Sequence, residues 1–194
     1  MRSPDRPASR AAARLATVRF ALAIVCRGYC RTRRARPFQG VSAGRAHATV
    51  TICPVLRLPN ELYAKMVGHC ISGLPDEACG LLAGHAERGE VVACYPTRNA
   101  AASAKVYAVD SRDMLAADRD ADSHGTEIIG VFHSHTHTDA YPSPTDVAQA
   151  PDPGWHYVLV SLRDTHPVVR SYTIVDGLID EESVVVHTHD LPLV

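Results

Sequence analysis

The chain has 194 residues and a nearly balanced charge, with 20 basic and 21 acidic side chains and a formal net charge of −1. It has no apolar stretch of the roughly 20 residues that cross a bilayer as a helix, so no transmembrane span is predicted. The balance conceals two unlike segments, because residues 1–48 carry a formal charge of +10 and residues 49–194 carry −11.

Residues 1–48 have the composition of an extension rather than of a folded core. They hold eleven arginines, no lysine and one acidic residue, Asp5, among many Ala, Ser and Pro residues. Their only apolar run, Phe20 to Cys26, is followed by no small-residue cleavage site, which argues against a targeting peptide. We interpret the segment as a disordered extension, or as upstream sequence included by a wrongly chosen start codon. Binding of nucleic acid by this basic arm is not favoured.

Residues 49–194 have a length typical of one domain, and their first half mixes strands with helices. The pattern predicts a helix that starts with Pro59 at its first position and ends at Pro75, and a second helix over Arg112–Ala121 with Ser111 as its N-cap. Strands are predicted at Val55–Leu58, Ala78–Ala83, Val91–Tyr95 and Lys105–Val109, with a turn at Glu87–Glu90.

The second half of this domain is rich in strands. The apolar, β-branched run Ile128 to Phe132 predicts a buried strand that leads into His133. Further strands are predicted at Trp155–Ser161, Val168–Val175 and around Ser183–Val186, with Asp176-Gly177 as a hairpin turn. The predicted fold class is therefore α/β, a single domain with a mixed β-sheet flanked by helices.

Two histidines and one aspartate form a candidate metal site after the Ile128–Phe132 strand. His133 and His135 are two residues apart, so both side chains point to the same face at the strand's end. Two imidazoles and the carboxylate of Asp146 suit zinc and leave a fourth position open for water, which is typical of a catalytic rather than a structural zinc site. His137 has the same strand parity and is an alternative third ligand, although the chain is expected to leave the strand before it.

The segment between the histidines and Asp146 predicts how the carboxylate returns to the site. Ser143 and Pro144 are typical of the N-cap and the first position of a helix. Asp146 then lies in the first helical turn, where the helix dipole also favours a carboxylate. A loop of this length is long enough to bring Asp146 back to His133 and His135.

The pattern His-x-His, seven residues, Ser, two residues, Asp resembles the motif of the JAMM/MPN+ metalloprotease family. That family also needs an upstream glutamate, which Glu77 matches in the block Pro75 to Gly80. The resemblance implies that Glu77 is a catalytic acid/base that does not ligate the zinc, and that Ser143 donates a hydrogen bond to the developing oxyanion. For Ser143, the simpler role of a helix N-cap is compatible with the catalytic one.

The stretch 55–186 resembles compact bacterial members of this family that act on ubiquitin-like sulfur-carrier proteins. The resemblance implies hydrolysis of the amide at a carrier's Gly-Gly tail, with release of cysteine in cysteine biosynthesis. Only 21 residues separate His135 from Tyr157, which leaves little room for a ubiquitin-gripping insertion. Two alternatives stay open: general processing of carrier tails after Gly-Gly, and a non-catalytic MPN interaction scaffold.

The cysteines give no sign of a disulfide framework or of a second metal site. Cys53, Cys70, Cys79 and Cys94 are scattered over apolar elements, and no Cys-x-x-Cys pair occurs. Together with the lack of a clear signal peptide, this usage is typical of the reducing cytoplasm. Arg98 and Arg112 are the sequence's candidates for binding the carboxylate of the released cysteine.

Overall fold

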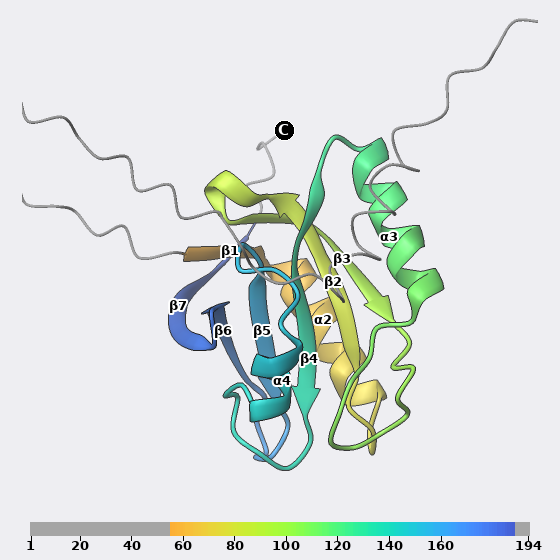
Figure 1. Cartoon of the computed structure of the whole chain (residues 1–194), viewed down its shortest axis with the longest axis vertical. Coiled ribbons are helices and arrows are strands. Elements are labelled where there is room, and N and C mark those ends of the chain that lie inside the picture. The colour runs from red at the N-terminus through yellow and green to blue at the C-terminus, as the bar shows by residue number, and fades with distance from the viewer. Residues whose placement is uncertain (1–54, 189–194) are drawn as a thin grey trace, which may run out of the picture. The chain divides into compact units, whose positions relative to one another are not determined.

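The computed structural model describes residues 55–188, whose strands form one sheet that closes on itself in the order β1-β3-β2-β4-β5-β6-β7 (Figure 1). The strands are β1 (Val55–Pro59), β2 (Cys79–His85), β3 (Glu90–Thr97), β4 (Glu127–His135), β5 (His156–Ser161), β6 (Val168–Val175) and β7 (Leu178–His187). β1 is parallel to both β3 and β7, β4 is parallel to β5, and the other neighbours are antiparallel. The predicted α/β class with a mixed sheet is confirmed.

Three α-helices accompany the sheet: α2 (Asn60–Ser72), α3 (Ser111–Ser123) and α4 (Pro144–Gln149). A single 3₁₀ turn, Ala86–Arg88, joins β2 to β3. Across residues 55–188, no helix has the length and apolar character needed to cross a membrane. The predicted extension, residues 1–48, and its boundary with the domain lie outside the described residues.

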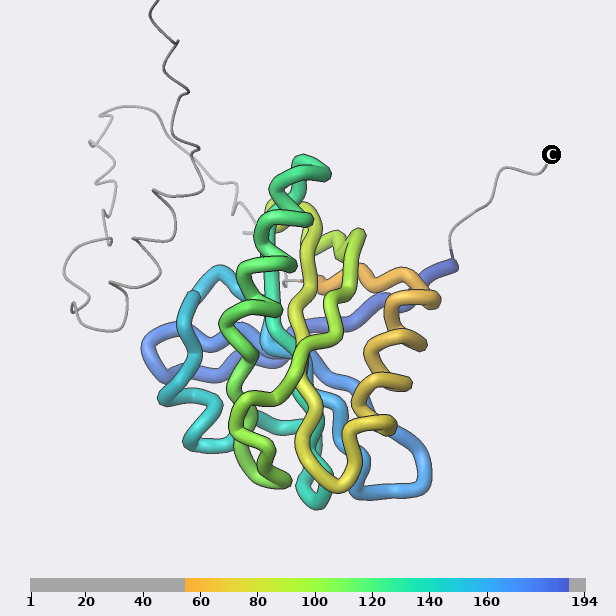
Figure 2. The backbone as a smooth tube through the Cα atoms, turned by 90° about the vertical axis from the view of Figure 1, so that its right-hand side faces the viewer, coloured from red at the N-terminus to blue at the C-terminus, as the bar shows by residue number. Residues whose placement is uncertain are grey.

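The strand period places two hydrophobic clusters on opposite faces of the sheet. Leu82, Phe132 and Val158 pack on the face that carries α2, whereas their neighbours in sequence pack on the face that carries α3. Figure 2 shows α2 and α3 on either side of the central strands. Val131 belongs to the α3 face, so His133 and His135, which share its parity, emerge on that face as well.

Several local predictions are confirmed. β6 has the predicted bounds, and β2, β3, β4 and β5 lie within one to three residues of theirs. The Asp176-Gly177 turn has φ angles of 51° and 79°, the two positive values that a type I′ hairpin requires. Because this turn is so tight, β7 begins directly after it at Leu178, five residues earlier than the predicted last strand.

The predicted strand at Lys105–Val109 is wrong. This segment makes only an isolated bridge between Asn99 and Val109, because the side chain of Asn99 takes up the backbone groups that a strand partner would bind. Residues 98–110 instead form a long loop between β3 and α3, called the 98–110 loop below.

The predicted starts of both helices are wrong by one position. Asp110 rather than Ser111 caps α3, and its carboxylate accepts hydrogen bonds from the backbone of Arg112 and Asp113. Pro59 is the N-cap of α2 rather than its first residue, with an extended ψ of 141°. Gly73 follows as the C-cap, so α2 ends before Leu74.

Candidate metal centre

β4 carries two buried histidines to its carboxyl end. His133 and His135 point to one face, and their Nε2 atoms lie 3.2 Å apart. Ser134, between them, faces the other way and joins β4 to the residue before β2. Its backbone N–H donates to the carbonyl of Ala78, and its Oγ accepts from the N–H of Ala78, both at 2.9 Å. This pairing fixes the two imidazoles beside the segment that contains Glu77.

α4 begins with a capping box that orients Asp146. The Oγ of Ser143 accepts from the backbone N–H of Asp146 at 3.2 Å, and the backbone N–H of Ser143 donates to Oδ2 of Asp146 at 2.7 Å. The predicted helix start is thus confirmed. The carboxylate oxygens of Asp146 face the two imidazoles. Oδ1 lies 3.4 Å from Nε2 of His133, and Oδ2 lies 3.4 Å from Nε2 of His135.

These three donor groups fit the coordination sphere of one zinc ion. Ligand atoms about 2.0–2.1 Å from a tetrahedral zinc lie about 3.3 Å from one another. The two imidazole Nε2 atoms are 3.2 Å apart, and each lies 3.4 Å from one of the two carboxylate oxygens of Asp146. His137, the alternative ligand, is exposed, and its Nδ1 forms a hydrogen bond with Thr136. The geometry therefore favours Asp146 over His137 as the third ligand.

Neighbouring groups hold the imidazoles in place. The Nδ1–H of His135 donates to the carbonyl of Asp139 at 2.8 Å, which leaves Nε2 free to ligate a metal. The ring of His133 stacks on Tyr107, with centroids 4.1 Å apart and an interplanar angle of 19°. Tyr107 comes from the 98–110 loop, so this loop covers the site from the side of β3.

Burial and the hydrogen bonds among them shift the pKa values of His133, His135 and Asp146. Burial raises the pKa of Asp146, but hydrogen bonds from His133 and His135 outweigh it and hold that pKa well below its usual range. Burial lowers the pKa of His133, which favours the neutral, metal-binding imidazole. Burial also lowers the pKa of His135, but the hydrogen bonds with Asp146 and Asp139 raise it more.

Glu77 is buried just before β2, where it is 6% exposed. Its backbone N–H donates to the carbonyl of Ser103 at 2.9 Å, and its own carbonyl accepts from Nδ2 of Asn99 at 2.8 Å. Burial raises the pKa of its carboxyl to about 7, a shift that His135 opposes and Asp146 increases. A carboxyl with this pKa both accepts and returns a proton near neutral pH, as an acid/base catalyst must.

No local sequence pattern predicts the roles of Asn99 and Tyr107, because both depend on contacts across the fold. Asn99 binds four backbone groups: its Nδ2 donates to the carbonyls of Glu77 and Val106, and its Oδ1 accepts from the N–H groups of Ala101 and Ala108. It therefore joins the 98–110 loop to the backbone of Glu77.

Asn99→Ala is expected to lower the free energy of unfolding by about 1–3 kcal/mol, since the substitution leaves partly buried backbone groups without a partner. Denaturant unfolding measures this change. Asn60→Ala is the matched control, because Asn60 is exposed at the start of α2. An equal effect of the two substitutions would show that Asn99 does not hold the loop.

Cys79 lies near the site but is not suited to act as a nucleophile. Burial raises the pKa of its thiol, and its Sγ lies 3.4 Å from Oγ1 of Thr97 and 3.7 Å from the carbonyl of Arg98. Cys70 and Cys94 are likewise buried and free, as predicted, whereas Cys53 lies outside the described residues.

Comparisons with known proteins give the family to which this chain is similar. Residues 59–175 match the family model of prokaryotic homologs of the JAB domain. The chain is 44% identical over 131 residues to the CysO-cysteine peptidase of Mycobacterium tuberculosis. The aligned residues cover 67% of this chain and 90% of that protein. It is 36% identical over 88 residues to the desampylase of Haloferax volcanii, covering 45% of this chain and 63% of that protein. A solution structure from Desulfitobacterium hafniense superposes with a TM-score of 0.64 at 34% identity, covering 69% of this chain and 94% of that one.

Proposed function

Because the chain belongs to the prokaryotic JAB-domain branch of the JAMM/MPN family and is a peptidase, we propose that it hydrolyses the amide at the C-terminal tail of a ubiquitin-like sulfur-carrier protein. The substrate is a carrier whose Gly-Gly tail is joined to cysteine, and the products are free cysteine and the regenerated carrier. One observation carries the proposal. The cluster of His133, His135 and Asp146 lies within electrostatic reach of the buried Glu77, in a chain 44% identical to a CysO-cysteine peptidase over 90% of that protein.

In this proposal His133, His135 and Asp146 hold one zinc ion per chain. Bound zinc supplies Lewis acidity, which acidifies water and polarises the scissile carbonyl. In the proposal Glu77 takes a proton from the attacking water as the water oxygen bonds to the carbonyl carbon. It then delivers that proton to the leaving nitrogen, so the C–N bond breaks and the amine departs.

Ser143 is the second side chain that we propose to act at this centre. Its Oγ accepts from the N–H of Asp146, so its own hydroxyl hydrogen remains available to an oxyanion. The cap and the catalytic donor are therefore compatible roles of one hydroxyl.

Ser143→Ala is expected to lower turnover by about 10²–10³-fold, the effect of removing an oxyanion donor. Zinc is retained, because the backbone N–H of Ser143 still donates to Asp146. The lost N-cap also costs about 0.5–2 kcal/mol of stability. Steady-state kinetics, metal analysis and thermal melting separate the effects, and a change confined to melting would leave Ser143 as a cap alone.

The surroundings of the site favour a flexible tail as the substrate. β3 pairs with β1 only at Glu90, so within residues 55–188 the outer edge of β3 toward Thr97 has no neighbouring strand. Thr97 is in register with Cys79, which is in register with His133, so this edge ends two strands from His133, at the end of the sheet that carries the metal-binding residues. An extended Gly-rich tail adds main-chain hydrogen bonds to such an edge.

The test is hydrolysis of defined carrier conjugates by the purified, zinc-loaded chain. We expect release of cysteine and an intact carrier ending in Gly-Gly, detected by mass, and inhibition by a zinc chelator. Short tail peptides are expected to be poorer substrates, because contacts with the carrier body stabilise the transition state. Cleavage of isopeptide-linked conjugates with carrier–cysteine left intact would overturn the carrier–cysteine substrate and favour an activity like that of the desampylase relative.

A further inference from the structure

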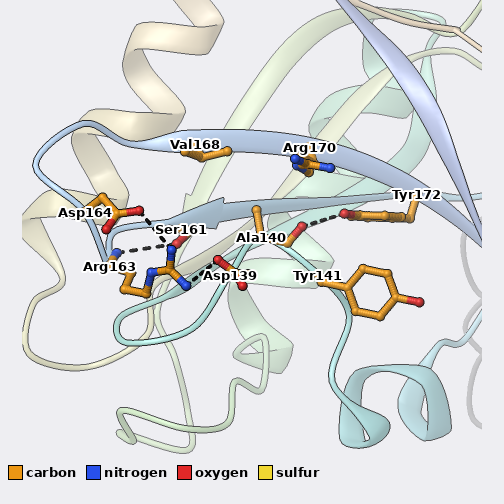
Figure 3. A pocket seen from close by; sticks show the side chains of 9 residues that line it. All are labelled: Asp139, Ala140, Tyr141, Ser161, Arg163, Asp164, Val168, Arg170 and Tyr172. Atoms are coloured by element: carbon orange, nitrogen blue, oxygen red, sulfur yellow. Dashed lines mark hydrogen bonds and ion pairs between the residues drawn. The ribbon is translucent and has the colours of Figure 1, made fainter.

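A pocket of about 400 Å³ lies between the loop that follows β4 and the strands β5 and β6 (Figure 3). One wall is the chain between the metal-binding residues, with Asp139 and Tyr141. The other wall is the β5–β6 connection and β6, with Arg163, Val168 and Arg170. Tyr172 closes the floor by donating its hydroxyl to the carbonyl of Ala140.

The sheet register places this pocket next to the proposed centre. His133 is in register with Leu159, which is in register with Arg170, so His133 and Arg170 lie on the same face two strands apart. Neighbouring strands are about 4.8 Å apart, so the two backbones are about 10 Å apart. One extended residue spans about 3.5 Å, and the long side chain of Arg170 covers much of the remaining distance.

Arg163 is connected to the centre more directly. Its guanidinium lies 2.6 Å from a carboxylate oxygen of Asp139, and the carbonyl of that same residue accepts from His135. Arg163 also pairs with Asp164 at 3.2 Å, and all the partner carboxylates are exposed: Asp139 by 73%, Asp164 by 62%, and Glu181, which pairs with Arg170, by 51%. Such surface ion pairs are weak, so an incoming carboxylate can compete for both guanidinium groups.

The arginines that the sequence favoured lie elsewhere. Arg98 pairs with Asp110 and Asp113 at 2.8 and 2.9 Å and so joins the 98–110 loop to α3. Arg112 is exposed on the first turn of α3. Neither residue lines the pocket beside His135.

We propose that this pocket binds the residue that leaves during hydrolysis, with its free C-terminal carboxylate held by Arg163 and Arg170. The inference rests on the proposed function and extends it to the choice of leaving group. A tail that enters along β3 reaches the centre on one side, and the residue after the scissile bond then extends over β5 and β6 on the other. The exposed side chains of Tyr141 and Val168 contact the body of that residue. The enzyme is therefore selective for conjugates that end one residue beyond the scissile amide.

The test compares two conjugates that differ in one group. Both carry cysteine on the Gly-Gly tail; in one the cysteine ends in a carboxylate and in the other in a carboxamide. We expect kcat/KM to favour the carboxylate by about 10–100-fold, the effect of hydrogen bonds to a charged group. In Arg170→Gln and Arg163→Gln, cleavage of the carboxylate conjugate falls, and the ratio between the two conjugates moves toward one.

Arg88→Gln is the matched control, because Arg88 also pairs with an exposed carboxylate, that of Glu90, at 2.8 Å but lies outside the pocket. It is expected to keep the wild-type ratio. Cleavage of both conjugates at equal rates by the wild-type chain would overturn the pocket assignment and leave the proposed function standing. An unchanged ratio between the two conjugates in both pocket variants would also overturn the pocket assignment alone. No cleavage of either conjugate by the wild-type chain would overturn the pocket assignment and the proposed function together.

Discussion

Glu77→Gln is expected to lower turnover by about 10²–10⁴-fold while zinc and substrate stay bound. Glutamine has nearly the same shape but cannot accept a proton from water. The contacts that position residue 77 use its backbone, which donates to Ser103 and accepts from Asn99, so they survive the substitution. Single-turnover kinetics on the carrier–cysteine conjugate, with metal analysis of the same sample, measure the effect.

Glu61→Gln provides the control for this substitution. Glu61 is exposed on the first turn of α2, so the same chemical change there is expected to leave turnover unaltered. Substrate binding to the Glu77 variant, measured at equilibrium, separates a loss of chemistry from a loss of affinity. Near-normal turnover in Glu77→Gln would transfer the acid/base role to another group.

The parts of the site that the sequence predicted are those governed by local rules. The two-residue strand period orients His133 and His135, and the capping preference of Ser143 starts α4 and directs Asp146. Each rule operates within a few residues, so the spacing alone determines the geometry. Glu77 was identified by family resemblance, because its place beside the histidines depends on the pairing of β2 with β4.

The parts that the sequence did not predict depend on distant partners. Residues 105–109 have strand-like composition, but Asn99 binds their backbone and holds them as a loop. The stacking of Tyr107 on His133 joins residues 26 positions apart. The closure of the sheet requires β1 to reach β7 from the opposite end of the domain, a pairing that no local pattern encodes. The pocket at Arg163 and Arg170 is likewise formed by separate segments.

His133→Ala or Asp146→Ala is expected to remove zinc and activity together, the largest effect predicted for this chain. With one of three protein ligands gone, the two that remain do not hold the ion against competing water and buffer. Both side chains also contact His135, since Nε2 of His133 lies 3.2 Å and Oδ2 of Asp146 lies 3.4 Å from its Nε2, so their loss also removes contacts that position His135. Metal analysis of the purified variants measures the occupancy, and circular dichroism establishes that they remain folded.

His137→Ala makes this prediction specific to the proposed ligands. His137 follows His135 by two residues and has the same strand parity, yet it is exposed and its Nδ1 bonds to Thr136 rather than facing Asp146. We expect this variant to keep full zinc and full turnover. Full zinc occupancy in both His133→Ala and Asp146→Ala would contradict the ligand assignment. Zinc lost from His137→Ala but kept in Asp146→Ala would identify His137 as the third ligand. The position of the attacking water relative to Glu77 would then change as well.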